Sequence, residues 1–152
     1  MKYLLVAALA WLLAQSTKRA LNVLGYNKRV FRDGESALFL SGGMPSGHSA
    51  TVVALSMSIG LMEGFDTTAF AISGIFAVIV MYDAMKVRYS SGVQGDTINS
   101  LIKEQKSHIA KVRVAHGHTP REVIVGALVG AVVASVVFLL TQIGRASCRE
   151  RV

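Results

Sequence analysis

One histidine of this sequence stands where a helix should begin. His48 belongs to the segment Pro-Ser-Gly-His-Ser at residues 45–49. Pro45 suits the first turn of a helix, because the amide hydrogen that it lacks would have no partner there. Ser46, Gly47 and His48 then lie among the free amides of that turn, which can bind an anion such as phosphate, and His48 can donate a proton to it. The competing interpretation is a glycine-rich turn, a capped helix and an incidental surface histidine.

A second histidine precedes a helix start of the same kind, in the segment His-Gly-His-Thr-Pro-Arg-Glu at residues 116–122. Thr119 is a candidate cap, Pro120 the first helical residue and Glu122 the third, which is the spacing of a capping box. The carboxylate of Glu122 has two possible roles. It could bind the cap amide, or it could hold the imidazole of His118 in the tautomer that leaves one nitrogen free as a nucleophile.

Cations near these segments could compensate the charge of a phosphate. Lys18 follows the first apolar stretch and Arg88 follows the third, although long cationic side chains also occur beside membrane spans without any ligand. Asp83 ends the third stretch, where Lys86 or Arg88 is its expected partner, and this pair could be purely structural. Two alternating histidines without a clear third ligand make a weak metal site, so we predict no metal and no cofactor.

The composition predicts which solvent surrounds these residues. Of the 152 residues, 52% are hydrophobic and only 16% are charged, with a formal net charge of +7. This is too apolar for an ordinary soluble domain, so we expect an all-α integral membrane protein with a single embedded domain over residues 1–143. Residues 144–152 change abruptly in character and are predicted to be an artefactual or disordered tail.

Apolar stretches predict about four transmembrane helices. The first, Tyr3 to Gln15 with a possible continuation to Leu24, could also be the core of a signal peptide, but Trp11 and Gln15 stand where a cleavage site would want small residues. The other three are residues 45–63, 67–83 and 120–143. In the last of them, Gly126 and Gly130 form a small-residue stripe that we interpret as a helix-packing surface.

The polar region at residues 84–118 predicts one more helix, lying at the membrane interface. Its apolar residues recur at helical spacing after a candidate cap at Asp96: Ile98, Leu101, Ile102, Ile109 and Val112. Four spans put this region and the loop at residues 16–44 on one side of the membrane. Both are rich in Lys and Arg, so the positive-inside bias predicts that this side, with all the reactive residues, is cytoplasmic.

Three strings together make the pattern specific: GGMPSGHSA, VMYDAMKVR and GHTPREVIVG. The combination resembles the divergent branch of the type 2 phosphatidic acid phosphatase family, which is related to vanadium-dependent haloperoxidases. The resemblance covers most of residues 8–130. It implies a lipid phosphate or diphosphate as substrate, hydrolysed through a phosphohistidine intermediate, in a bacterial, archaeal or plastid membrane. Membrane lipid is the expected partner, nucleic acid is not, and phosphate or vanadate could occupy the site.

The resemblance also implies roles for individual residues. His118 would be the nucleophile, Glu122 its orienting carboxylate and His48 the general acid, while Lys18, Ser46, Gly47 and Arg88 would bind phosphate. Asp83, Lys86 and Arg113 are possible supporting residues. The sequence departs from the family pattern, because no Arg-Pro pair follows Lys18 and a valine, Val112, stands where the third motif has an arginine. These departures affect phosphate binding more than the chemistry of the two histidines, and they keep open a non-enzymatic protein that binds a phosphorylated lipid or a protein partner.

Overall fold

The computed structural model describes residues 1–26, 43–112, 114 and 117–149, with side chains as far as residue 143. All regular structure in these ranges is helical, which confirms the predicted all-α fold. Arg113, one of the predicted supporting residues, lies outside the described residues. The elements in chain order are α1 (Lys2–Val23), α2 (Gly47–Glu63), α3 (Thr68–Tyr82), the π-helical turn η1 (Asp83–Val87), α4 (Arg88–Glu104) and α5 (Pro120–Arg149).

Within the described residues, three helices are long and apolar enough to cross a membrane. They are α1, the continuous helix from α3 through η1 to the end of α4, and the Pro120–Ile143 part of α5. The predicted stretch at residues 45–63 forms α2, which has only 17 residues. At about 1.5 Å per residue α2 is about 25 Å long, shorter than a hydrocarbon core of about 30 Å.

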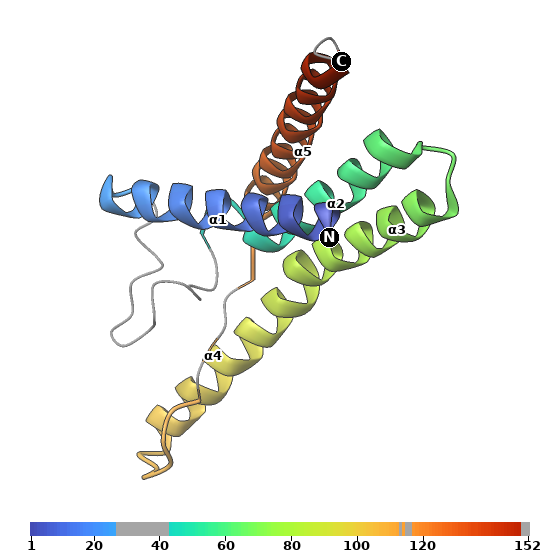
Figure 1. The fold of residues 1–152 in the computed structure, drawn as a ribbon. Helices are drawn as coiled ribbons and strands as arrows, with labels where there is room; N and C mark the ends of the chain where they lie inside the picture. The colour runs from blue at the N-terminus through green and yellow to red at the C-terminus, as the bar shows by residue number, and fades with distance from the viewer. Residues whose placement is uncertain (27–42, 113, 115–116, 150–152) are drawn as a thin grey trace.

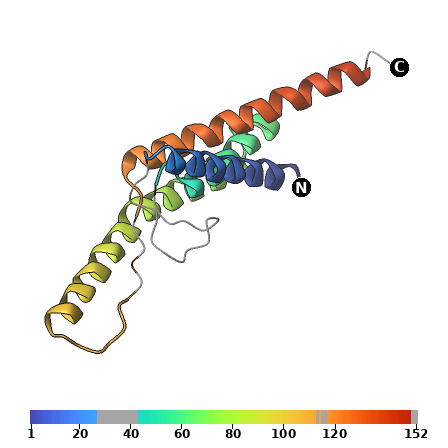
Figure 2. The same ribbon diagram turned by 90° about the vertical axis from the view of Figure 1, so that its left-hand side faces the viewer.

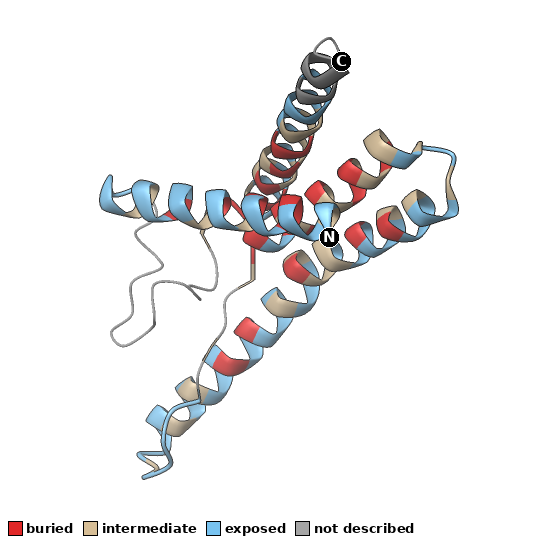
Figure 3. Cartoon of the chain, in the orientation of Figure 1, coloured by how far each residue is buried: buried red, intermediate tan, exposed pale blue. Residues whose placement is uncertain are grey.

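The short helix α2 packs against the three other helices of the bundle, α1, α3 and α5. Figures 1 and 2 show α1, α2, α3 and α5 gathered together, with α4 projecting away from them. In Figure 3 the buried residues lie where these helices face one another, and the outer faces are exposed, as expected for a protein that lipid surrounds. The core cluster consists of small and branched side chains from α1, α2 and α5: Val6, Ala10, Ala54, Val133 and Ala134.

The close packing of α2 on α5 depends on the two glycines of the predicted stripe. Gly126 lies against the backbone of Ser46, and Gly130 lies against the backbone of Ala50 and Ala54. A methyl group on either glycine would overlap these backbone atoms. The stripe is therefore a packing surface, as the sequence indicated.

The polar helix α4 differs from the predicted interfacial helix in its bounds. It continues directly from α3 and η1, so Asp96 lies inside the helix rather than at its cap. It ends at Glu104, which leaves Ile109 and Val112 in the segment that returns toward α5. The side chain of Asn99 holds this return segment, because its Nδ2 donates to the Val112 carbonyl and its Oδ1 accepts from the Val112 amide, both at 2.8 Å.

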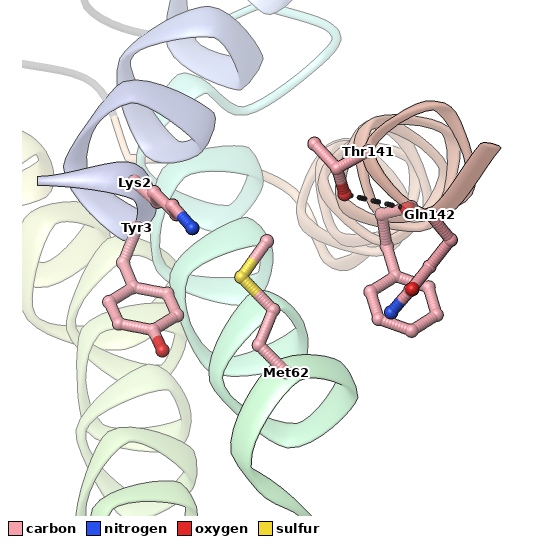
Figure 4. A pocket seen from close by; sticks show the side chains of 6 residues that line it. Lys2, Tyr3, Met62, Thr141 and Gln142 are labelled. Atoms are coloured by element: carbon pink, nitrogen blue, oxygen red, sulfur yellow. Dashed lines mark hydrogen bonds between the residues drawn. The ribbon is translucent and has the colours of Figure 1, made fainter. Parts of the chain in front are cut away.

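The end of the bundle formed by the start of α1 and the end of α2 contains a small cavity of about 160 Å³ (Figure 4). Lys2 and Tyr3 of α1, Met62 of α2 and Thr141 and Gln142 of α5 line it, together with Phe138. Beside it the Tyr3 hydroxyl donates to Glu63 at 2.7 Å, joining α1 to the end of α2. The two predicted histidines lie at the other end of α2 and α5, so this cavity is not part of the site that they form.

Candidate active site

The start of α5 holds His118 through Glu122. The predicted capping box is present: the Thr119 amide donates to Glu122 Oε2 at 3.2 Å, and the Glu122 amide donates to Thr119 Oγ1 at 3.4 Å. The same Oε2 lies 2.9 Å from Nδ1 of His118. A carboxylate only accepts hydrogen bonds, so Nδ1 carries the proton and Nε2 is the nitrogen with a lone pair. Glu122 therefore makes both of the contacts that its spacing allowed.

The start of α2 carries His48. Helix α2 begins at Gly47 with Ser46 as its cap, so Pro45 stands before the cap and not in the first turn as predicted. The reason is that the Ser46 hydroxyl accepts a hydrogen bond from the Ser49 amide at 3.4 Å. This bond makes Ser46 the N-cap and Gly47 the first helical residue. Pro45 and Ser46 are fully buried.

The two helix starts are joined directly to each other. The Ser46 amide donates to the backbone carbonyl of Glu122 at 3.0 Å, and Gly126 lets the backbones approach this closely. Two of the predicted phosphate-binding residues, Ser46 and Gly47, therefore make contacts that hold the helices together. The Ser46 hydroxyl caps α2, and Gly47 is buried against Trp11 and Gln15 of α1.

The imidazoles of His48 and His118 face each other across the two helix starts. Their ring centroids are 6.5 Å apart, and the ring planes meet at 62°. His118 is only 6% exposed, whereas His48 lies at the surface. Partial burial lowers the pKa of His48 below its ordinary value. The positive charges of Arg88, of His118 when it is protonated, and of Lys18 lower it further, while Asp83 acts in the opposite direction.

Both predicted phosphate-binding cations belong to this group of residues. Lys18, on α1, is 3% exposed and interacts electrostatically with Glu122 and His48. Arg88 also acts on His48, and its Nε donates to Asp83 Oδ2 at 3.4 Å. The side chains of Arg88 and Asp83 are 40% and 45% exposed, so this ion pair is open to solvent. The structure thus brings together residues from α1, α2, η1, α4 and α5.

Lys86, the other supporting residue within the described chain, is not brought to the imidazoles. It is exposed and lines an open hollow with Tyr82, Ser90 and Gln94 along the outer side of the helix that runs from α3 to α4. Among the described residues, no three side chains of His, Cys, Asp or Glu gather in a way that could hold a metal ion.

Comparison with known proteins identifies the family of this chain. Residues 1–133 match the Divergent PAP2 family, and this range contains every residue of the site described above. The chain belongs to the Divergent PAP2 family. This confirms the family that the three sequence strings indicated.

One curated relative of this Divergent PAP2 protein is the uncharacterized membrane protein YuiD of Bacillus subtilis (strain 168). The two are 41% identical over 105 residues, a match that covers 59% of this chain and 66% of the relative. The match therefore spans just under two thirds of the relative's length. A search of solved structures gave no match.

Sequence reasoning missed two contributors to this Divergent PAP2 site. The carbonyl of Ala84 accepts the His118 amide at 2.9 Å, and Gly117 lies directly against the backbone of Arg88 and Tyr89. A glycine between two histidines was the available signal at position 117. No signal existed for Ala84, because it acts through its backbone.

Proposed function

We propose that this protein is a membrane phosphatase that hydrolyses a lipid phosphate or diphosphate through a phosphohistidine on His118. The observation that carries the proposal is the hydrogen bond between Glu122 Oε2 and Nδ1 of His118, with His48 on the other side. That bond fixes the tautomer whose Nε2 can attack phosphorus. Their ring centroids are 6.5 Å apart, so both imidazoles can act on one phosphate group bound beside them.

The reaction has two steps. In the first, Nε2 of His118 forms a bond to phosphorus while the bond from phosphorus to the leaving oxygen breaks, and protonated His48 gives its proton to that oxygen. In the second, His48, now neutral, takes a proton from a water molecule whose oxygen bonds to phosphorus, while the bond from phosphorus to Nε2 of His118 breaks and inorganic phosphate leaves. Glu122 stabilises the positive imidazole of His118 in both steps.

The phosphoryl oxygens would be bound by Lys18, Arg88 and the free amides at the start of α2. Charge develops on these oxygens in the transition state, and fixed cations and amides stabilise it without reorganisation. Lys18 is already buried beside the histidines. Arg88 pairs with Asp83, so phosphate binding would exchange the Asp83 carboxylate for the substrate at the guanidinium. We place the site on the cytoplasmic side of the membrane.

Phosphate release from purified protein tests this function. The wild type in lipid vesicles is incubated with lipid monophosphates and lipid diphosphates, and released phosphate is measured. His118→Ala should abolish turnover, and His48→Ala should lower kcat by about a hundredfold to ten-thousandfold, the range for general acid catalysis. His108→Ala is the matched control, because this exposed histidine lies in the segment after α4. Absence of phosphate release from every lipid phosphate would contradict the proposal.

A second candidate function is binding of a phosphorylated lipid or a protein partner without turnover. The pairing of Arg88 with Asp83, together with the valine at position 112, favours it, because both reduce the positive charge available for the transition state. Vanadate or phosphate that raises the thermal unfolding midpoint of the wild type, but not of His48→Ala or His118→Ala, would select this function if no phosphate is released.

A further inference from the structure

The helix that carries Asp83 and Arg88 contains one π-helical turn, η1, directly beside the two histidines. In this turn the Arg88 amide donates to the carbonyl of Asp83, five residues earlier. In an α-helix the Arg88 amide would bind the carbonyl of Ala84 instead. The wider turn therefore releases the Ala84 carbonyl from its usual intrahelical partner.

The released carbonyl holds the backbone of the proposed nucleophile. The His118 amide donates to Ala84 at 2.9 Å, a contact across 34 residues of sequence. Gly117 makes the approach possible, because a methyl group there would lie 2.5 Å from the Tyr89 amide nitrogen and 3.0 Å from the Arg88 carbonyl carbon. These are backbone atoms of a helix, which cannot turn aside as a side chain can.

The same turn aligns the ion pair that acts on His48. Residues five apart in an α-helix point about 140° away from each other around the axis, so they cannot pair. Asp83 and Arg88 are five apart, yet Arg88 Nε lies 3.4 Å from Asp83 Oδ2. The wider turn brings their side chains to one side of the helix, where both interact with His48.

We propose that η1 positions the groups that surround both histidines. Gly117 and the Ala84 carbonyl are the positioning groups for His118. The inference rests on the proposed function, since it assigns these groups to the same reaction. Their role is to hold the His118 backbone so that Nε2 stays in line with phosphorus. A displacement of about 1 Å can cost about a hundredfold in rate.

Two variants test the positioning role, each with a matched control. Gly117→Ala puts a methyl group against the helix, and its control is Gly74→Ala, where the nearest atom to the new methyl group is Ser56 Oγ at 3.8 Å. Deletion of Met85 restores α-helical register, so that Ala84 would bind the Tyr89 amide, now four positions on, and lose His118. Asp83 and Arg88 become four apart and can still pair. The control is Met85→Ala, which keeps the number of residues in the turn.

The measurements are kcat, KM and the NMR signal of the His118 Nδ1 proton, with thermal unfolding as the check on folding. We expect Gly117→Ala and the Met85 deletion to lower kcat by about a hundredfold with little change in KM and to displace the His118 signal. Both controls should match the wild type. If the deletion variant does not fold, Gly117→Ala decides the question.

The outcomes separate this inference from the proposed function. An active wild type whose two test variants keep their kcat and His118 signal would overturn the positioning role and leave the phosphatase function standing. If the wild type releases no phosphate, the phosphatase function fails, but the NMR signal still decides. A displaced His118 signal in the folded test variants supports the positioning role, and an unchanged signal overturns it.

Discussion

The double role of Glu122 leads to the sharpest prediction, because one oxygen atom serves two donors. Oε2 accepts one hydrogen bond from Nδ1 of His118 at 2.9 Å and another from the Thr119 amide at 3.2 Å. Glu122→Gln keeps an oxygen that can accept one of these bonds but removes the charge. Thr119→Ala removes the other half of the capping box and leaves the carboxylate in place. The two variants should therefore separate catalysis from helix capping.

The expected size of each effect follows from these bonds. A hydrogen bond to a charged group contributes about 1.5–3 kcal/mol and a neutral one about 0.5–1.5 kcal/mol, so loss of the charge alone costs about 1–1.5 kcal/mol. At about 1.4 kcal/mol per factor of ten, this is about a tenfold loss of kcat. If the glutamine turns its NH₂ group toward Nδ1, the wrong tautomer is favoured, and the loss approaches the ten-thousandfold measured for a carboxylate-to-amide change in a serine protease.

The two variants should differ in kcat and not in stability. Thr119→Ala removes a cap side chain and should lower the free energy of unfolding by about 1 kcal/mol, with kcat nearly unchanged. Glu122→Gln should lower the free energy of unfolding by a similar amount, because the loss of charge weakens both hydrogen bonds and the attraction to the buried Lys18. The assay is phosphate release beside thermal unfolding of the same preparations. If Glu122→Gln keeps wild-type kcat, or if Thr119→Ala loses as much activity as Glu122→Gln, the orienting role of Glu122 is refuted.

Three further predictions concern packing and charge. Gly126→Ala should destabilise the protein by about 1–3 kcal/mol because its methyl group overlaps the Ser46 backbone, as measured by thermal unfolding against Gly74→Ala as control. Because the pKa of His48 lies below its ordinary value and the general acid must be protonated, kcat/KM should fall as the pH rises through a midpoint below about 6.5; a midpoint at or above this value would contradict the assignment. Arg88→Gln should raise the pKa of His48 and Asp83→Asn should lower it, which NMR titration of the substrate-free protein can measure, and shifts in the same direction would show that the two charges do not act on His48 as the structure places them.

Local sequence rules predicted the parts of the site that local contacts build. The spacing from Thr119 to Glu122 predicted the capping box, and the structure contains it. The same kind of rule placed the start of α2 near Pro45 but missed the first helical residue by two positions. Proline and serine are both common at helix starts, and only the hydrogen bond from the Ser49 amide to Ser46 decides between them.

The sequence could not predict where α4 ends. Apolar residues continue at helical spacing past Glu104 to Ile109 and Val112, so the pattern predicts a longer helix. The chain turns back at Lys106, which has a φ of 48°. Glycine or asparagine usually marks such a left-handed residue, and a lysine gives no such signal. The π-helical turn is equally hidden, because nothing in Asp-Ala-Met-Lys-Val distinguishes it from an ordinary helical turn.

The fold adds what neither histidine segment contains, namely the connection between them. The backbone carbonyl of Glu122 accepts the Ser46 amide, while its side chain holds His118, so one residue links the start of α2 to the proposed nucleophile. These two links are chemically independent. A bulkier residue at position 126 should push α2 away from α5 and change the distance between the imidazoles, because it acts on Ser46. The bond between His118 and Glu122 lies within the start of α5 and should persist. Such a variant would therefore keep an oriented nucleophile and lose its proton donor, so its activity should resemble that of His48→Ala.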